Sequence, residues 1–179
     1  MQNIELKARY EEFDFARQCI QQLGGRFRRI LTQKDIYFDC ERGRLKLRLN
    51  SDEDTGELIF YQRDDQPGPR ESQYQIYLAP EPARLEAMLR AAYNVRTIVE
   101  KTRELYTIDN VRVHLDTVVG LGSFIEFEAV MTPERDYQEE QRKLEKYLHI
   151  FQIEPSQLVP LSYCDLMERK KAAHEAKGV

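Results

Sequence analysis

The sequence predicts an α+β fold in which an antiparallel sheet, closed or nearly closed, carries helices on its outer side. The first observation behind this prediction is that apolar and polar residues alternate with a period of two in eight stretches, as in strands that bury one face. The second is that turn signals join most of these stretches directly. The third is that few helical patterns lie between them, so few crossovers are available and antiparallel pairing is favoured.

The eight predicted strands are residues 3–10, 35–40, 44–50, 57–63, 73–78, 99–108, 110–118 and 123–131. Residues 52–56 predict a hairpin turn. Residues 64–70, with the sequence DDQPGPR, predict a longer loop, because two prolines and a glycine exclude regular structure. We expect this loop to be mobile without ligand and to close over one mouth of the barrel when a ligand binds.

The helical patterns lie between these strands and after the last one. The first pattern has Asp14 as its N-cap and ends at Gly24, and Pro82 begins the second. A capping signal at Thr132 precedes a long third helix with an apolar stripe. Ser162 begins a shorter helical segment. These helices supply the apolar surface that must cover the outside of the sheet.

Length and composition limit the classes of protein. The chain has 179 residues, of which 41% are hydrophobic and 32% charged, so we expect one globular domain over residues 1–179 with a frayed tail at 169–179. The net charge of −4 argues against nucleic-acid binding. Cys19, Cys40 and Cys164 have no CxxC spacing and predict neither disulfides nor a zinc site. With no signal peptide and no membrane span in the sequence, we expect a cytoplasmic monomer or homodimer without a membrane partner.

The polar faces of the predicted strands carry nine Lys or Arg and five Asp or Glu, although the chain as a whole is acidic. These residues are Glu5, Lys7, Arg9, Asp35, Arg44, Lys46, Arg48, Arg63, Lys101, Arg103, Arg112, Asp116, Glu126 and Glu128. For any one strand, a solvated polar face is the simpler interpretation. For all strands together we favour a binding site, because helices must cover the apolar faces, such as Leu45 to Leu49, and the charged faces then converge.

The mixture of charges predicts the class of ligand. Enclosed Lys and Arg suit phosphate groups, because Arg binds two oxygens at once and Lys adds a point charge. The carboxylates would repel a polyphosphate unless they hold Mg²⁺ or Mn²⁺, which accept carboxylate and phosphate oxygens together. Glu126 and Glu128 are two residues apart on one strand, so both point the same way and can bind one ion. The sequence therefore predicts a metal–triphosphate site for a triphosphate-containing small molecule.

A succession of motifs gives this prediction a family context. The motifs are NIELK at 3–7, QKDIYFD at 33–39, GRLKLR at 43–48, RVHLDTVVGLGSFIEFE at 112–128 and SYCDLM at 162–167. Together they resemble the CYTH superfamily, or triphosphate tunnel enzymes, whose hallmark is Glu-x-Glu-x-Lys on the first strand. The class IV adenylyl cyclase-like branch is the most similar. The resemblance implies an eight-stranded antiparallel β-barrel, open at both ends, with helices packed outside.

The resemblance also implies roles for individual residues. The phosphate-binding residues would be Lys7, Arg9, Lys46, Arg48, Arg63, Lys101, Arg103 and Arg112. The ligands of Mg²⁺ or Mn²⁺ would be Glu5, Asp116, Glu126 and Glu128, and the catalytic residues Glu5, Lys7, Glu126 and Glu128. Asp116 would alternatively orient a basic neighbour. Tyr37 and His114 are interpreted as hydrogen-bonding residues of the wall.

One position departs from the family pattern. Asn3 stands where the hallmark has its first glutamate, which removes a full negative charge and weakens the case for a second metal ion. Three functions stay open. A triphosphatase would use a metal-activated water, a class IV adenylyl cyclase would form cyclic AMP and pyrophosphate from ATP, and a polyphosphate-binding module would have lost catalysis. The triphosphatase ranks first because the sequence identifies no adenine pocket.

Overall fold

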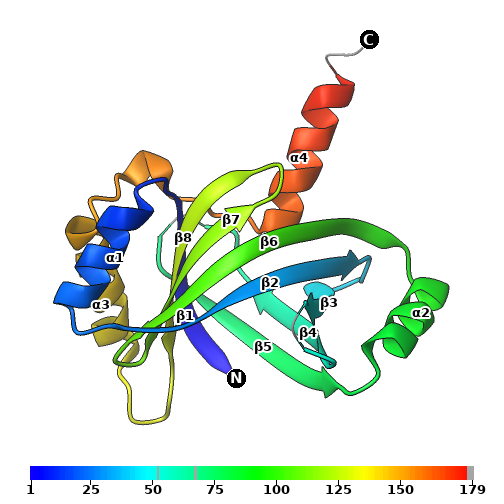
Figure 1. The fold of residues 1–179 in the computed structure, drawn as a ribbon, viewed down its shortest axis with the longest axis horizontal. Helices are drawn as coiled ribbons and strands as arrows, with labels where there is room; N and C mark the ends of the chain where they lie inside the picture. Colours follow the sequence, from blue (N-terminus) through cyan, green and yellow to red (C-terminus); the bar gives the residue numbers. More distant parts are fainter. Residues whose placement is uncertain (52, 67, 177–179) are drawn as a thin grey trace.

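Eight antiparallel strands close into a barrel in the structure, a computed structural model that describes residues 1–51, 53–66 and 68–176 (Figure 1). The order of strands around the barrel is β1-β5-β4-β3-β2-β6-β7-β8, and each neighbouring pair is antiparallel. The predicted fold class, an eight-stranded antiparallel barrel with helices outside, is therefore confirmed.

The bounds of the elements follow the chain. The strands are β1 (Gln2–Arg9), β2 (Arg26–Phe38), β3 (Arg44–Asn50), β4 (Gly56–Arg63), β5 (Arg70–Ala79), β6 (Val95–Ile108), β7 (Val111–Val118) and β8 (Gly122–Val130). The helices are α1 (Phe13–Gln22), α2 (Pro82–Ala92), α3 (Tyr137–Ile150) and α4 (Tyr163–Glu175), with a short 3-10 turn η1 (Pro155–Gln157) before α4.

Three strands begin at least three residues earlier than the alternation predicts, and one of them is β5, which begins at Arg70 rather than at residue 73. β2 begins at Arg26 rather than at residue 35, and β6 begins at Val95 rather than at residue 99. Residues 26–30 are exposed on both faces, so they carry no alternating pattern. Their strand conformation comes from pairing with β6, in which Arg26 lies opposite Thr107. Pairing between segments so distant in sequence leaves no local signal.

Helix termini follow the predicted chemistry in part. The side chain of Ser162 accepts a hydrogen bond from the backbone N–H of Asp165, so Ser162 is the N-cap of α4, as predicted. The N-cap of α1 is Glu12 rather than Asp14. Asp14 lies in the first turn of α1, where a carboxylate interacts favourably with the helix dipole.

The C-terminal helix is longer than expected. α4 continues to Glu175, so residues 169–175, which we expected to fray, are helical. Asp52 of the predicted turn, Pro67 of the predicted loop and residues 177–179 of the predicted tail lie outside the described residues. Within the part of the chain that the structure describes, the helices are too short or too polar to cross a membrane.

The apolar clusters lie on the outside of the barrel wall. The largest joins α1 and α3 to the outer faces of β1, β6, β7 and β8, where Ile4, Leu6 and Phe127 are fully buried (Figure 1). A smaller cluster lies between α2 and the outer faces of β2 and β3, and includes Ile36 and Leu47. The helical cover predicted for the apolar strand faces is therefore confirmed, and the inside of the barrel is left to polar side chains.

Residues 158–167 cover one end of the barrel, the end from which α4 rises in Figure 1. The hydroxyl of Tyr163 donates a hydrogen bond to Asp116 of β7 at 2.8 Å. Nη1 of Arg70, on β5, donates to the carbonyl oxygen of Val159 at 3.3 Å. The resemblance implies a tunnel, and this segment packs at one of its ends, where Ser162 and Tyr163 join the lining of the cavity.

Candidate active site

The barrel encloses a cavity of about 230 Å³, lined by side chains from all eight strands and from the segment before α4. Alternate residues of a strand point to opposite faces. Asn3, Glu5 and Lys7 of β1 therefore face the cavity, while Ile4 and Leu6 join the outer apolar cluster. The same alternation on the other strands makes the lining mostly polar and charged.

Ten of the predicted site residues lie on this lining. They are Glu5, Lys7, Lys46, Arg48, Arg63, Lys101, Arg103, Arg112, Glu126 and Glu128. Tyr37 and His114, interpreted as wall residues, lie there too. The structure thus brings together residues from seven strands that are far apart in the sequence.

Arg9 and Asp116 lie elsewhere, which corrects the sequence interpretation. Arg9 is exposed at the end of β1, where its Nη1 donates to the carbonyl oxygen of Leu121 at 3.1 Å. Asp116 is fully buried, and its two oxygens accept hydrogen bonds from Arg103 and Tyr163. Since both oxygens are engaged, Asp116 positions Arg103, which agrees with its expected role as a residue that orients a basic neighbour and not with metal binding.

Asp35 of β2 holds three cations together on one side of the cavity. It accepts hydrogen bonds from Nε and Nη2 of Arg48 at 2.8 and 3.0 Å, from Nζ of Lys46 at 2.9 Å and from Nζ of Lys101 at 2.8 Å. β2 lies between β3 and β6, so the cations reach Asp35 from both neighbouring strands. One carboxylate against three cations leaves this wall positively charged.

Crowding changes the ionisation of this cluster. Burial, together with the charges of Arg48 and Arg103, lowers the pKa of Lys101 to about 7. Burial and Arg48 lower the pKa of Lys46 to about 8. Burial alone would raise the pKa of Asp35, but its cationic partners outweigh burial and hold this pKa well below its usual range. A bound polyanion would favour the protonated lysines and so restore the positive charge.

This arrangement predicts a pH dependence for the binding of an inorganic triphosphate. The folded-state pKa of Lys101, about 7, lies below the ordinary lysine value of 10.5, so the ligand-free fold gains stability as the pH rises between these values while the binding of a polyanion weakens. We expect the affinity for tripolyphosphate to fall by about tenfold per pH unit above the pKa of Lys101 if one proton is taken up. Calorimetric titrations from pH 6.5 to 9 measure this slope.

The matched variant for this measurement is Lys101→Arg, because arginine stays protonated throughout the range. The affinity of Lys101→Arg for tripolyphosphate should fall less steeply with pH, because about one proton fewer is taken up on binding. The titration of tripolyphosphate itself is the same in both experiments and does not affect this difference. Lys34→Arg is the control, since Lys34 belongs to β2 and is not part of the cavity lining. Parallel slopes for wild type and Lys101→Arg would contradict the assignment.

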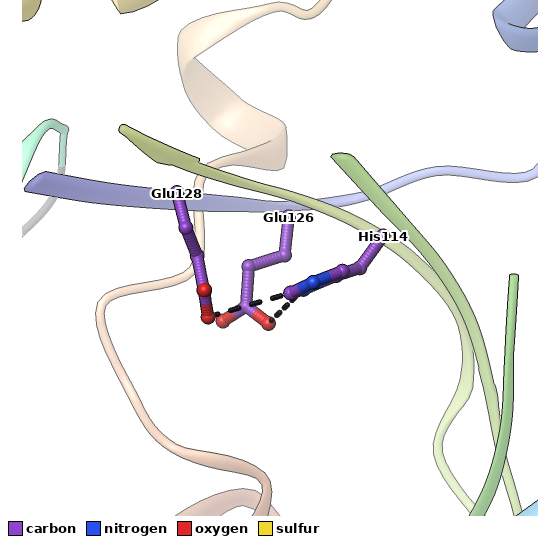
Figure 2. A group of neighbouring side chains, drawn as sticks. All are labelled: His114, Glu126 and Glu128. Atoms are coloured by element: carbon purple, nitrogen blue, oxygen red, sulfur yellow. Dashed lines mark hydrogen bonds and ion pairs between the residues drawn. The ribbon is translucent and has the colours of Figure 1, made fainter. Parts of the chain in front are cut away.

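Glu126, Glu128 and His114 meet on the adjoining wall of the barrel, on β7 and β8, where β7 pairs with β6 (Figure 2). Nδ1 of His114 lies 3.3 Å from Oε2 of Glu126 and 3.9 Å from Oε1 of Glu128. Lys7 lies 3.2 Å from Glu126. Arg112 lies 2.8 Å from Oε2 of Glu128. This wall therefore combines two carboxylates with an imidazole at its centre and cations at its margins.

The charges around these carboxylates keep them ionised. Burial alone would raise the pKa of Glu126, but Lys7, the hydrogen bond with His114 and the charge of Arg103 hold it well below its usual range. Burial alone would also raise the pKa of Glu128, but the charges of His114 and Arg112 outweigh burial and lower this pKa. Both groups are thus available as anionic ligands near neutral pH.

Glu5 has different partners from those that the motif suggests. It lies beside the guanidinium groups of Arg63 and Arg70, and Nη2 of Arg70 donates to its Oε1 at 3.0 Å. Nε and Nη2 of Arg63, as well as Nε of Arg112, are buried and have no hydrogen-bond partner among the residues that the structure describes. These donors line the cavity and suit phosphate oxygens.

The residues present fit a divalent ion. Glu126, Glu128 and His114 each offer one ligand atom, and these atoms lie within 4.8 Å of one another. Oδ1 of Asn3 is buried in the same cavity and lacks a hydrogen-bond partner in the described part of the chain. Mg²⁺ and Mn²⁺ accept carboxylate and amide oxygens. Glu5 is not a member of the group.

Three contributions to the site were missed from the sequence. Arg70, assigned to a loop, begins β5 and is 1% exposed opposite Glu5. Asp35 appeared as one more carboxylate, although it is the centre of the cation cluster. Tyr163 lines the cavity from outside the barrel strands. Each depends on strand pairing or on the covering segment, for which the local sequence gives no signal.

Comparisons with known proteins identify relatives of this chain in sequence and in fold. The chain is 23% identical over 176 residues to a Methanocaldococcus jannaschii protein named "Putative adenylate cyclase", covering 93% of this chain and 98% of the relative. A solved Pyrococcus horikoshii structure superposes with a TM-score of 0.80 at 22% identity, covering 92% and 98% of the two chains. A Hippeastrum structure, described as a "Putative adenylyl cyclase" that reveals a dominant triphosphatase activity, has a TM-score of 0.65 at 14% identity and covers 94% and 96%.

The family assignment follows from the sequence profile of the CYTH domain, which matches residues 1–163. This match covers all eight strands and reaches the segment that covers one end of the barrel. The chain therefore belongs to the CYTH domain family.

Proposed function

We propose that this protein is a divalent-metal-dependent enzyme that acts on a triphosphate, and that it is a phosphohydrolase. The substrate would be inorganic or organic, such as tripolyphosphate, thiamine triphosphate or a nucleoside triphosphate. The ion would be Mg²⁺ or Mn²⁺.

The observation that carries this proposal is the division of one cavity into two chemically different walls. The wall on β2, β3 and β6 presents the cations gathered by Asp35. The wall on β7 and β8 presents Glu126 and Glu128 with His114. A triphosphate in such a cavity would place its oxygens on the cations, and the carboxylates would hold a divalent ion beside it.

Individual residues have distinct tasks in this proposal. Lys46, Arg48 and Lys101 bind phosphate oxygens while Asp35 fixes their positions. Arg103 donates hydrogen bonds of 2.6 and 2.7 Å to Asp116 and one of 2.8 Å to Glu126. In this proposal Arg103 binds the phosphate group that lies next to Glu126. A bound ion would draw charge from the phosphate oxygens and activate water. The half-satisfied guanidinium of Arg63 adds donors for charge that develops on the leaving group.

The relatives support an activity on triphosphates without selecting the substrate. The Methanocaldococcus jannaschii relative carries an adenylate cyclase name, whereas the Hippeastrum protein is described with a dominant triphosphatase activity. Both reactions need a cationic clamp for the phosphates. They differ in which phosphorus lies beside the nucleophile.

One assay tests the proposal. Purified protein is given ATP, thiamine triphosphate or tripolyphosphate with Mg²⁺ or with Mn²⁺, and phosphate, pyrophosphate and cyclic AMP are measured separately. We expect phosphate release from at least one substrate. Cyclic AMP with pyrophosphate as the main products would instead favour the class IV cyclase. Binding of triphosphates without any product would favour a polyphosphate-binding module and overturn the enzymatic proposal.

An apolar part of the cavity favours an organic triphosphate as substrate, which the second candidate, a class IV cyclase, requires. Leu31, Ile59, Ile76 and Leu105 line the cavity together with the charged residues. Ile59 and Ile76 are directly opposite each other on β4 and β5, and Ile76 is 40% exposed. An inorganic triphosphate has no apolar group that would contact this surface. The ring of an organic triphosphate, such as the adenine of ATP, would cover it and remove it from water.

Ile76→Ser should therefore weaken the binding of ATP by about 5- to 10-fold, the effect of losing about 1–1.4 kcal/mol of apolar contact. Binding of tripolyphosphate should not change, because Ile76 contacts no phosphate in this arrangement. Calorimetric titrations in chelator, where turnover is prevented, measure both affinities. Tyr77→Ser is the matched control, since Tyr77 is exposed on the same strand but does not line the cavity. Equal losses for ATP and tripolyphosphate would contradict an organic subsite.

A further inference from the structure

His114 occupies an unusual place for a residue of the barrel wall. It is 4% exposed, and its Nδ1 faces the two carboxylates of Glu126 and Glu128 (Figure 2). The register of β7 and β8 explains this arrangement, because His114 lies directly opposite Glu126, and Arg112 lies opposite Glu128. On one face of an antiparallel pair, direct and diagonal neighbours are in contact. The three ligand atoms therefore converge through strand pairing.

Two other carboxylates of the cavity, Asp35 and Glu5, are engaged by cations. Asp35 accepts hydrogen bonds from Lys46, Arg48 and Lys101. Glu5 lies against Arg63 and Arg70. Neither Asp35 nor Glu5 belongs to a group of three metal-ligating side chains in the part of the chain that the structure describes.

Glu128 is oriented differently. Its Oε2 pairs with Arg112, and its Oε1 faces Nδ1 of His114. Glu126 presents Oε2 to the same imidazole, although Lys7 and Arg103 also contact this carboxylate. A carboxylate has two oxygens with several lone pairs, so a neighbouring cation does not prevent it from binding a metal ion. A nitrogen and two carboxylate oxygens thus surround one point.

We propose that His114 is a nitrogen ligand of the divalent-metal centre, beside Glu126 and Glu128, and that this centre selects Mn²⁺ over Mg²⁺. The inference rests on the proposed function, because the same ion would serve the triphosphate. Imidazole is a good ligand for first-row transition ions, whereas Mg²⁺ takes oxygen ligands and retains its waters. Asn3 lines the same cavity but offers a neutral oxygen where a glutamate would add a third carboxylate, so the nitrogen donor contributes more to the affinity of this centre.

The direct test is pulsed electron paramagnetic resonance of the protein with Mn²⁺ alone, without any triphosphate. Coordination by an imidazole gives echo modulation from the nitrogen nucleus, and we expect this modulation in the wild type. In His114→Gln the modulation should disappear and Mn²⁺ binding should weaken by about 10- to 100-fold. Mg²⁺ binding, measured by competition, should change by less than about threefold because glutamine offers an oxygen.

His149→Gln is the matched control, since His149 is exposed on α3, outside the barrel. It should keep both the modulation and the wild-type affinity for Mn²⁺. Melting curves in chelator check that His114→Gln is folded. If it is not, modulation that persists in the double variant His149→Gln/His174→Gln assigns the nitrogen to His114, because the chain has three histidines.

The outcomes separate this inference from the proposed function. Mn²⁺ that binds without nitrogen modulation and still supports triphosphate turnover would overturn the role of His114 and leave the proposed function intact. Modulation that persists in His114→Gln would also overturn it. Nitrogen modulation from His114 in a protein that turns over no triphosphate would support the metal centre and count against the enzyme.

Discussion

Asp35→Asn lowers the free energy of unfolding by about 3–5 kcal/mol, the typical effect of leaving buried charge without its partner. Asp35 is 1% exposed, and its two oxygens accept hydrogen bonds from Lys46, Arg48 and Lys101. Asparagine has nearly the same shape, so packing is preserved while the negative charge that gathers these cations is removed. Urea denaturation of both proteins at neutral pH measures the change.

The matched control for this variant is Glu100→Gln. Glu100 precedes Lys101 on β6 but is exposed, so its loss should change stability by less than about 0.5 kcal/mol. Saturating tripolyphosphate should raise the melting temperature of Asp35→Asn by more than that of the wild type, because the ligand replaces the missing counter-charge. A destabilisation below about 1 kcal/mol would mean that Asp35 is not the centre of the cation cluster.

The barrel was predictable where each strand has one apolar and one polar face. β3 shows this most clearly, since Leu47 packs under α2 while Lys46 and Arg48 line the cavity, and the alternation predicts both positions. The first part of β2 was not predictable, because residues 26–30 are exposed on both faces and are ordered by pairing with β6. The alternation of apolar and polar residues reveals a strand that buries one face, and it gives no signal for a strand that is exposed on both faces.

The membership of the site was more predictable than its partnerships. Period-two reasoning places Glu5, Glu126 and Glu128 on the inside, but it treats all three as equivalent metal ligands. The pairing of β1 with β5 brings Arg70 opposite Glu5, and the pairing of β7 with β8 brings His114 opposite Glu126. The partner of a buried charge is set by register between strands, which the alternation within one strand does not specify.

Glu126→Gln lowers kcat/KM for the triphosphate substrate by about a thousandfold. A metal ion supplies several kcal/mol of transition-state stabilisation, and each 1.36 kcal/mol corresponds to a factor of ten. Glu126 is 6% exposed and contacts Lys7, Arg103 and His114, so removing its charge weakens the metal centre and also frees two cations to pair with the substrate instead. We expect substrate binding in chelator to persist or tighten while turnover is lost.

Two variants make this result specific. Glu126→Asp keeps the charge on a shorter side chain and should retain more activity than Glu126→Gln, whereas Glu145→Gln, on the exposed side of α3, should match the wild type. Steady-state rates with Mn²⁺, together with tripolyphosphate affinities in chelator, separate loss of turnover from loss of binding. If Glu126→Gln kept kcat/KM within about threefold of the wild type, the loss of transition-state stabilisation would be below about 1 kcal/mol. A carboxylate that holds the catalytic ion would have a larger effect, so the reacting phosphorus would have to lie away from β8.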